Sequence, residues 1–227
     1  MLGSPPLLLA VDTSTSTASL AVYDGERVLS ETTWVAGREH STRLLVEVEA
    51  ALERIARDAS HLTGLVVARG PGSFTGVRVA LSVAKGMAAG LGVPLWGVGS
   101  LDVVAHAGRT SELPVRAVLE AGRGRYATGL YRAGRRVEEP GTVSLDELVA
   151  CVEEPTLVIG ELSGEARARL GRDTVARVAG PAASTRRAGY LAELGWLAAQ
   201  AGERGDPGAV DAVYLAPRAS GGRLPHA

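Results

Sequence analysis

The order of predicted elements repeats once along this chain, and that repeat limits the folds the chain can adopt. Each half gives three strands, a helix, a further strand and a helix. The strands are short apolar runs bounded by turn residues, and the first helix has a single apolar face. In the first half the elements are predicted at Leu7–Val11, Ala18–Tyr23, Val28–Val35, His40–Arg57, Leu65–Ala68 and Phe74–Gly90.

The second half begins after a short loop near residues 108–114. A capping box at Ser144-Leu145-Asp146-Glu147 predicts the start of its first helix. Asp24-Gly25 in the first half and Ala133-Gly134 in the second are hairpin signals between neighbouring strands. The remaining elements are predicted at Val115–Glu120, Tyr126–Arg132, Arg136–Val143, Leu157–Ile159, Ser163–Leu170 and Ser184–Ala201.

This order predicts an α/β fold made of two similar lobes. Hairpin-linked strands followed by a helical crossover to a parallel strand produce a mixed sheet flanked by helices. Two such lobes form the duplicated actin-like (ASKHA, ribonuclease H-like) architecture. We expect an N-terminal lobe over residues 1–108 and a C-terminal lobe over residues 109–227, with a flexible tail from about residue 206.

Composition and charge narrow the classes of function. With 46% hydrophobic residues, 22% charged residues and a formal net charge of −1, the chain has no overall charge that would draw it to nucleic acid or a membrane. Cys151 is the only cysteine, which excludes an intrachain disulfide and suits a reducing compartment. No apolar run is long enough to cross a bilayer. We expect a cytoplasmic protein without a membrane partner.

The stretch Gly70–Arg78 joins a buried strand to a long helix through a glycine-rich turn. Ser73 is placed to cap the helix, and the first-turn N–H groups of such a helix attract anions. The candidate anion-binding residues are Gly70, Gly72, Ser73, Thr75 and Gly76. The spacing differs from a dinucleotide fingerprint, and Val77 stands where a Walker loop needs lysine. We therefore favour a structural turn over a nucleotide cradle.

Asp12 ends the first strand, where actin-like ATPases place an acidic residue beside phosphate and metal. The following turn, Thr13–Thr17, lacks the glycine that brings the backbone close to phosphate. Asp12 therefore marks a degenerate nucleotide position, and we favour a local capping role for its carboxylate. The 4 histidines show no helical pair spacing and no cysteine cluster is present. The sequence thus predicts no metal, no cofactor and no catalytic residue.

Several motifs of the first half together resemble the TsaB (also called YeaZ) family of tRNA threonylcarbamoyladenosine (t6A) biosynthesis. They are Val11–Ser14, His40-Ser41, Gly70–Arg78 and Gly97–Leu101. The second half matches mainly in element order, and Glu120-Ala121-Gly122 departs from the Asp-Ala-Arg of the family. The resemblance implies a non-catalytic partner that stabilises the threonylcarbamoyltransferase TsaD, with the small ATPase TsaE docking on that pair. It implies tRNA contact through the complex at most, and it leaves open whether the chain is a monomer or a homodimer when alone.

Two other functions fit parts of the sequence. An actin-like phosphotransferase would use Asp12 and the two glycine turns to hold ATP. A metallopeptidase-like activity follows an older label for this group of proteins, and the sequence offers no ligand set for its metal.

The helix Phe74–Gly90 carries only two charged residues, so we expect it to be covered on more than one side. The preceding helix has further apolar residues beside its core stripe. Together the two helices predict an exposed apolar patch that packs against a helix pair of TsaD or of a second copy of the chain. The predicted contact residues are Leu45, Val46, Glu49, Arg78, Leu81 and Lys85. The alternative is that the second lobe, or the helix after Ser100, covers this face.

Small residues recur every four positions along the same helix. They are Gly76, Ala80, Ala84 and Ala88. We expect this stripe to let the helix approach its neighbour closely, so that enlarging Gly76 impairs folding or partner binding.

Overall fold

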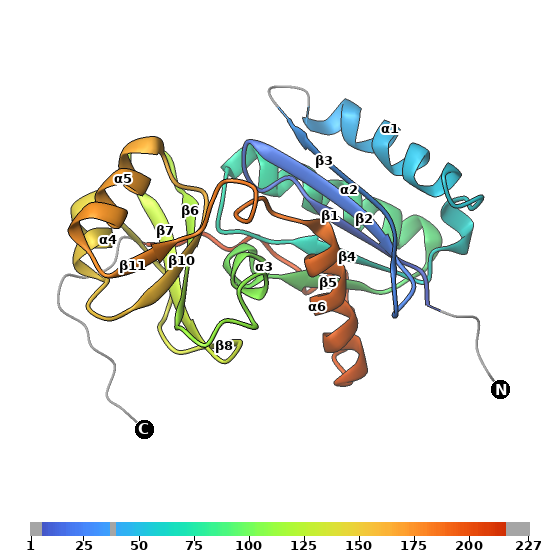
Figure 1. Ribbon diagram of the computed structural model, residues 1–227. Coiled ribbons are helices and arrows are strands. Elements are labelled where there is room, and N and C mark those ends of the chain that lie inside the picture. The colour runs from blue at the N-terminus through green and yellow to red at the C-terminus, as the bar shows by residue number, and fades with distance from the viewer. Residues whose placement is uncertain (1–5, 37–39, 217–227) are drawn as a thin grey trace. The chain divides into compact units, whose positions relative to one another are not determined.

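The computed structural model describes residues 6–36 and 40–216 of the chain (Figure 1). The chain forms two compact units. The first comprises Met1–Val103 and Arg186–Val213, and the second comprises Val104–Thr185 and Tyr214–Ala227. Each unit contains one mixed sheet with helices on it, which confirms the predicted duplicated actin-like fold class.

The first unit is built on a five-stranded sheet with the order β3-β2-β1-β4-β5. The antiparallel strands β1 (Leu8–Asp12), β2 (Thr17–Tyr23) and β3 (Val28–Val35) form one side of this sheet. The strands β4 (Gly64–Ala68) and β5 (Leu95–Val98) continue it in parallel with β1. The predicted hairpin at Asp24-Gly25 joins β2 to β3, with Gly25 at a φ of 92°.

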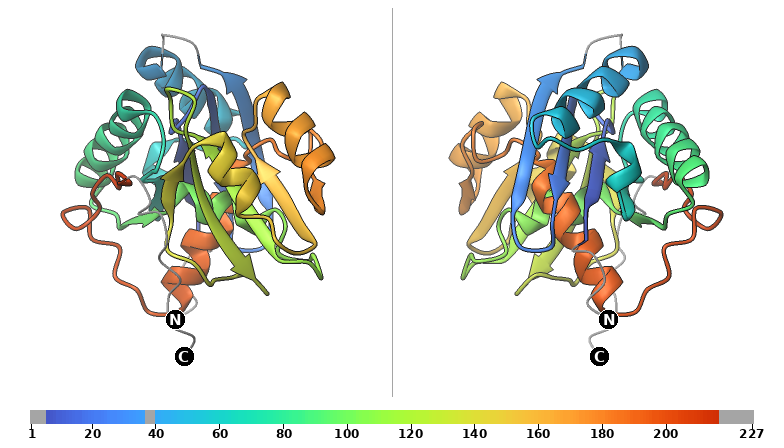
Figure 2. Two further views of the ribbon diagram at one scale, coloured as in Figure 1. Left: turned by 90° about the vertical axis from the view of Figure 1, so that its left-hand side faces the viewer. Right: turned by 90° about the vertical axis from the view of Figure 1, so that its right-hand side faces the viewer.

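Helices cover both faces of the first sheet, as Figure 2 shows. The helices α1 (His40–Glu53) and α2 (Phe74–Leu91) lie on one face, and α6 (Ala188–Gln200) lies on the other. Alternate residues of β1 serve the two cores, because successive side chains of a strand point to opposite faces. Leu9 and Val11 pack with α1 and α2, whereas Leu8 and Ala10 pack with α6. This burial on both faces explains the unbroken apolar runs in the sequence.

The second unit repeats the pattern with the strand order β11-β10-β6-β7-β8, and β9 also pairs with β7. The helices α4 (Leu145–Ala150) and α5 (Gly164–Asp173) share a core with this sheet. The predicted capping box is confirmed, because Ser144 and Glu147 bond each other's backbone N–H groups. The strands are β6 (Val115–Glu120), β7 (Tyr126–Arg132), β8 (Arg135–Arg136), β9 (Gly141–Val143), β10 (Thr156–Gly160) and β11 (Ala176–Val178).

Several boundaries differ from the sequence-based expectation. Helix α1 ends at Glu53 rather than Arg57, and Ala56 adopts a positive φ of 53° just beyond it. The strand predicted over Arg136–Val143 is divided into β8 and β9. A short 3-10 helix, η1 (Ala59–His61), and the edge strand β11 were not expected, while α3 (Ser100–His106) forms as predicted.

The division into units also differs from the expected lobes 1–108 and 109–227. The first segment ends at Val103, within α3, and α6 returns to the first unit. Helix α6 belongs there because its apolar residues close one face of the first sheet. A Cβ atom on Gly195 would lie 2.3 Å from Val66 Cγ2, so the helix approaches β4 more closely than a residue with a side chain would allow.

The tail expected to be flexible from about residue 206 is held against the first unit over residues 206–213, here called the C-terminal strap. Val210 of the strap is buried, and the Val213 N–H donates to the Arg69 carbonyl at 2.7 Å. Asp211 pairs with Lys85 of α2. The strap is therefore packed on the first unit. Residues 214–216 belong to the second unit, where the Thr142 N–H donates to the Ala216 carbonyl at 3.2 Å, and residues 217–227 lie outside the described residues.

Candidate functional site

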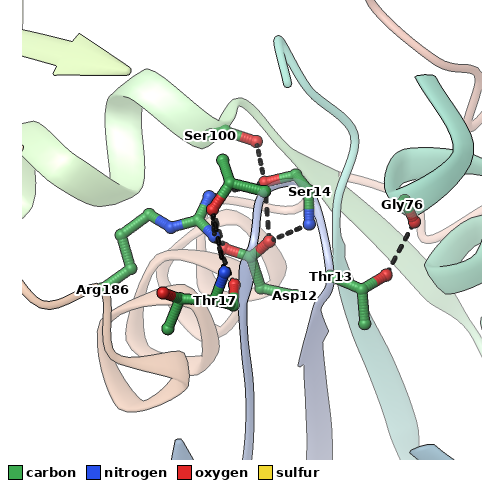
Figure 3. A network of polar contacts seen from close by, with 8 residues as sticks. Asp12, Thr13, Ser14, Thr17, Gly76, Ser100 and Arg186 are labelled. Carbon is green, nitrogen blue, oxygen red and sulfur yellow. Dashed lines mark hydrogen bonds and ion pairs between the residues drawn. The ribbon is translucent and has the colours of Figure 1, made fainter. Parts of the chain in front are cut away.

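The turn after β1 forms a buried polar network within the first unit (Figure 3). Asp12 is 1% exposed, and its Oδ1 accepts hydrogen bonds from the Ser14 N–H (2.8 Å) and the Ser14 hydroxyl (2.7 Å). The Ser100 hydroxyl at the start of α3 donates to Ser14 Oγ at 3.0 Å. This arrangement is the local capping role that the sequence predicted for Asp12. The aspartate side chain accepts the backbone N–H of the residue two positions later and so stabilises the turn.

The same network contains a residue that sequence reasoning missed. Arg186, which precedes the N-cap residue of α6, is 4% exposed and donates to the oxygens of three turn residues. Its Nη1 also lies 3.4 Å from Asp12 Oδ2, which makes an ion pair. Asp12 and Arg186 are thus buried opposite charges that neutralise each other, as burial of either charge requires. The turn partners of Arg186 are Ser14 Oγ (2.6 Å), Thr15 Oγ1 (2.8 Å) and Thr17 O (2.8 Å).

No local pattern marks Arg186, because Ser14 is 172 positions away in the sequence. The neighbouring residue is anchored separately. Arg187 pairs with Glu31 of β3 at 2.6 Å, and this hydrogen bond raises the pKa of Arg187 above its ordinary value. Glu31 also accepts the Gly189 N–H at 2.8 Å, which satisfies one of the unpaired donors at the start of α6. Arg187 and Glu31 therefore anchor the start of α6 to β3, separately from the network around Arg186.

The glycine turn before α2 is seated directly on this network. A Cβ atom on Gly72 would lie 2.0 Å from the Ser14 carbonyl oxygen, and one on Gly76 would lie 2.0 Å from that of Thr13. The Ser73 N–H donates to the Ser14 carbonyl at 2.6 Å, and the Thr13 hydroxyl donates to the Gly76 carbonyl at 2.6 Å. These glycines permit close approach of the chain's own backbone, as expected of a structural turn.

Two of the N–H groups that an anion would need, those of Ser73 and Gly76, are used inside the protein. Ser73 caps α2 as predicted, because its hydroxyl accepts the Gly76 N–H. Its own N–H is taken by Ser14, while Gly70 has a φ of 94° and lies against the strap at Val213. Thr75 is exposed. The geometry thus supports a structural role for this turn.

The helices α1 and α2 lie against each other and expose large apolar side chains. Leu45 and Val46 of α1 are 53% and 60% exposed, and Phe74 at the start of α2 is 56% exposed. Glu49 and Arg78 are exposed on the same two helices, and the Arg78 guanidinium lies 3.6 Å from the centre of the Phe74 ring. We call Leu45, Val46, Glu49, Phe74 and Arg78 the helix-pair face.

Two of the predicted contact residues are engaged within the first unit. Leu81 is only 7% exposed and belongs to the core beneath α1 and α2, so its predicted place on a partner surface is corrected. Lys85 pairs with Asp211 of the strap at 3.2 Å. The predicted small-residue stripe also faces inward: Gly76 meets Thr13, and Ala80, Ala84 and Ala88 are buried in the same core. The exposed side of α2 instead carries Ser82, Gly86 and Ala89.

The turn after β6 in the second unit is arranged differently. A pocket of about 470 Å³ lies beside it, lined by residues of this turn, of α4 and of α5. Two of its arginines pair with acidic residues of α4: Arg169 with Asp146 at 2.7 Å, and Arg125 with Glu147, which lies outside the lining, at 3.8 Å. The arginines gathered at this turn are therefore partly neutralised by acidic residues on the same unit.

Neither a metal-binding cluster nor a membrane-spanning helix is found among the described residues. Within residues 6–36 and 40–216, no three histidine, cysteine, aspartate or glutamate side chains form a group able to hold a metal ion. None of the helices in these ranges has the length and apolar character needed to cross a membrane.

Comparisons with known proteins agree with this architecture. The family model for TsaD, the tRNA N6-adenosine threonylcarbamoyltransferase, matches residues 32–169. The tRNA threonylcarbamoyladenosine biosynthesis protein TsaB of Escherichia coli is 32% identical over 163 residues, which cover 70% of this chain and 68% of that protein. TsaB of Bacillus subtilis is 35% identical over 125 residues, and the match spans only 55% of its length. The solved structure of YeaZ from Pseudomonas aeruginosa superposes with a TM-score of 0.76 at 27% identity, covering 92% of this chain and 100% of that one.

The duplicated mixed sheets and the closed turn after β1 define a protein of the actin-like class whose first phosphate-loop position is filled by its own side chains. The chain belongs to the TsaB (YeaZ) family, within the wider group that the threonylcarbamoyltransferase model describes.

Proposed function

We propose that this protein is a non-catalytic subunit in the formation of t6A in tRNA, and that it binds a TsaD-like threonylcarbamoyltransferase through the helix-pair face. The observation that carries the proposal is the exposure of Leu45, Val46 and Phe74 on two adjacent helices of a TsaB-family chain. Large apolar side chains grouped on a surface favour association, because their contact with water is removed when a partner covers them.

The rest of the face suits a helical partner. The exposed side of α2 carries small residues, so another helix is able to approach it closely. These residues are Ser82, Gly86 and Ala89. Glu49 and Arg78 would form the charged rim of the contact. A TsaE-like ATPase would dock on the assembled pair, and a second copy of this chain would occupy the same face when the partner is missing. Contact with tRNA would then arise only through the complex.

The geometry does not favour a phosphotransferase that uses Asp12. The carboxylate is buried, and it is occupied by Ser14 and Arg186, where such an enzyme needs room for magnesium and phosphate. We therefore propose no catalytic residue in the first unit.

The test is co-expression of this protein with the TsaD homologue of the same organism, followed by size-exclusion chromatography. The wild-type chain should co-elute with that homologue, and the double substitution Leu45→Glu and Val46→Glu should abolish co-elution while leaving the circular dichroism spectrum unchanged. Val175→Glu is the matched control, because Val175 is 55% exposed on the second unit. A complex that survives the double substitution would contradict the proposed face.

Threonylcarbamoylation of tRNA provides the functional readout. The TsaD homologue should modify its substrate only when the wild-type chain is added, and the double variant should fail to support the reaction. Modification by the TsaD homologue alone would contradict the proposed subunit role.

A further inference from the structure

We infer that the Asp12–Thr17 turn is a receptor for a guanidinium group, that Arg186 fills it, and that this occupancy positions the exposed first turn of α2 for the partner. The partner part of this inference rests on the proposed function. The guanidinium part rests on the geometry of the first unit alone.

The receptor matches the planar fork of arginine. The two terminal nitrogens of Arg186 meet different oxygens: Nη1 meets Ser14 Oγ and Asp12 Oδ2, and Nη2 meets Thr15 Oγ1 and Thr17 O. A lysine ammonium is a single point of charge and does not reach both sets of acceptors at once. The site is therefore built for a guanidinium group and not for positive charge in general.

The hydroxyl of Ser14 links this receptor to the rest of the network. It donates to Asp12 Oδ1 and accepts from both Arg186 Nη1 and Ser100 Oγ, so its one proton and two lone pairs are all used. Because every hydrogen-bonding site of this hydroxyl is used, a displacement of the turn leaves one of its polar partners unpaired. Arg186 thus holds the backbone of the turn in one position.

That backbone is also the seat of α2. The Ser14 carbonyl receives the Ser73 N–H, and the Thr13 hydroxyl donates to the Gly76 carbonyl, both at 2.6 Å. Phe74, which belongs to the helix-pair face, is the first residue of α2, and Arg78 of the same face lies about one turn further along the helix, against the Phe74 ring. A shift of the Asp12–Thr17 turn therefore moves the two side chains that we assign to the partner contact.

The inference is tested by chemical rescue in the full chain. Arg186→Ala removes the guanidinium and leaves a space that ethylguanidinium matches, since that ion restores the atoms deleted beyond Cβ. Without the ion, amide hydrogen exchange at residues 73–78 should accelerate at least about tenfold, while exchange at residues 84–88 of the same helix stays close to wild type. Ethylguanidinium at millimolar concentration should restore the protection, and ethylammonium should not.

Arg187→Ala is the matched control, because Arg187 is the adjacent arginine and pairs with Glu31 on the surface. It should leave exchange at residues 73–78 unchanged with or without ethylguanidinium. If Arg186→Ala accelerates exchange uniformly along α2, or if ethylammonium rescues as well as ethylguanidinium, the inference is overturned. If Arg186→Ala does not fold, Arg186→Lys takes its place, and wild-type protection at residues 73–78 in that variant also overturns it.

A measurement of binding to the TsaD homologue separates this inference from the proposed function. Arg186→Ala should bind the TsaD homologue about tenfold more weakly than wild type, and ethylguanidinium should recover the loss; a tenfold change corresponds to about 1.4 kcal/mol. Unchanged affinity in Arg186→Ala, with wild type still binding, overturns the positioning role. A wild-type chain that binds no TsaD homologue overturns the proposed function, while the exchange and rescue results still decide the guanidinium receptor.

Discussion

Replacing Gly76 by alanine should destabilise the first unit although alanine is the better helix former. A Cβ atom at this position would lie 2.0 Å from the Thr13 carbonyl oxygen, whereas real Cβ contacts essentially never fall below 3.0 Å, so one backbone segment must move by at least 1 Å. The oxygen belongs to a backbone that is held by the buried network, so the cost should be near the upper end of overpacking, about 3 kcal/mol. The gain in helix propensity offsets about 1 kcal/mol, leaving a net loss of about 2 kcal/mol.

Gly86→Ala is the matched control on the same helix. Gly86 lies inside α2 and a Cβ atom there would meet nothing within 4 Å, so alanine should raise the free energy of unfolding by about 0.5–1 kcal/mol. The assay is urea unfolding followed by tryptophan fluorescence, because all 3 tryptophans, Trp34, Trp96 and Trp196, belong to the first unit. A urea midpoint of Gly76→Ala equal to or above that of wild type would refute the argument, since it would mean that the backbone at Thr13 moves away from the new Cβ atom without a cost in stability.

Two further predictions concern the helix-pair face and the second unit. Leu81→Ala should lower the free energy of unfolding by about 3 kcal/mol because Leu81 is a core residue, whereas Leu45→Ala should change it by less than about 0.5 kcal/mol; urea unfolding compares them. The hydrogen bond from the Ser144 N–H lowers the pKa of Glu147, so the stability it contributes is present above its unfolded-state pKa and is lost as pH falls through its folded-state pKa. Glu147→Ala should therefore be less stable than wild type at pH 7, and unfolding curves recorded at decreasing pH should converge; a constant difference would contradict this.

Most of the fold could be predicted from the sequence, because the residue patterns that indicate its helices, strands and turns are local. The apolar run of β1, the hairpin at Asp24-Gly25 and the capping box at Ser144 each depend on residues a few positions apart. The ends of the helices and strands were harder to predict. Helix α1 stops short of Arg57 because the chain turns at Ala56, and that turn contains neither glycine nor proline.

The candidate site could be predicted from the sequence only in part. Exposure of Leu45 and Val46 agreed with the expectation from the apolar surplus of α1, but Leu81 did not, because an almost uncharged helix gives no indication of which face its own unit covers. The position of α6 was missed for a similar reason. Its apolar residues predict a buried helix without specifying which of the two sheets buries it.

The sequence by itself determined the two mixed sheets and the helices on them, since apolar runs, hairpin turns and helix caps are properties of neighbouring residues. Only the tertiary structure decided that Arg186 closes the turn after β1 and that the C-terminal strap returns to α2 through Asp211. The contact of Arg186 with Ser14 joins residues 172 positions apart. Such a contact has no local pattern, because it depends on where the folded chain brings a buried charge and on the requirement that this charge be neutralised there.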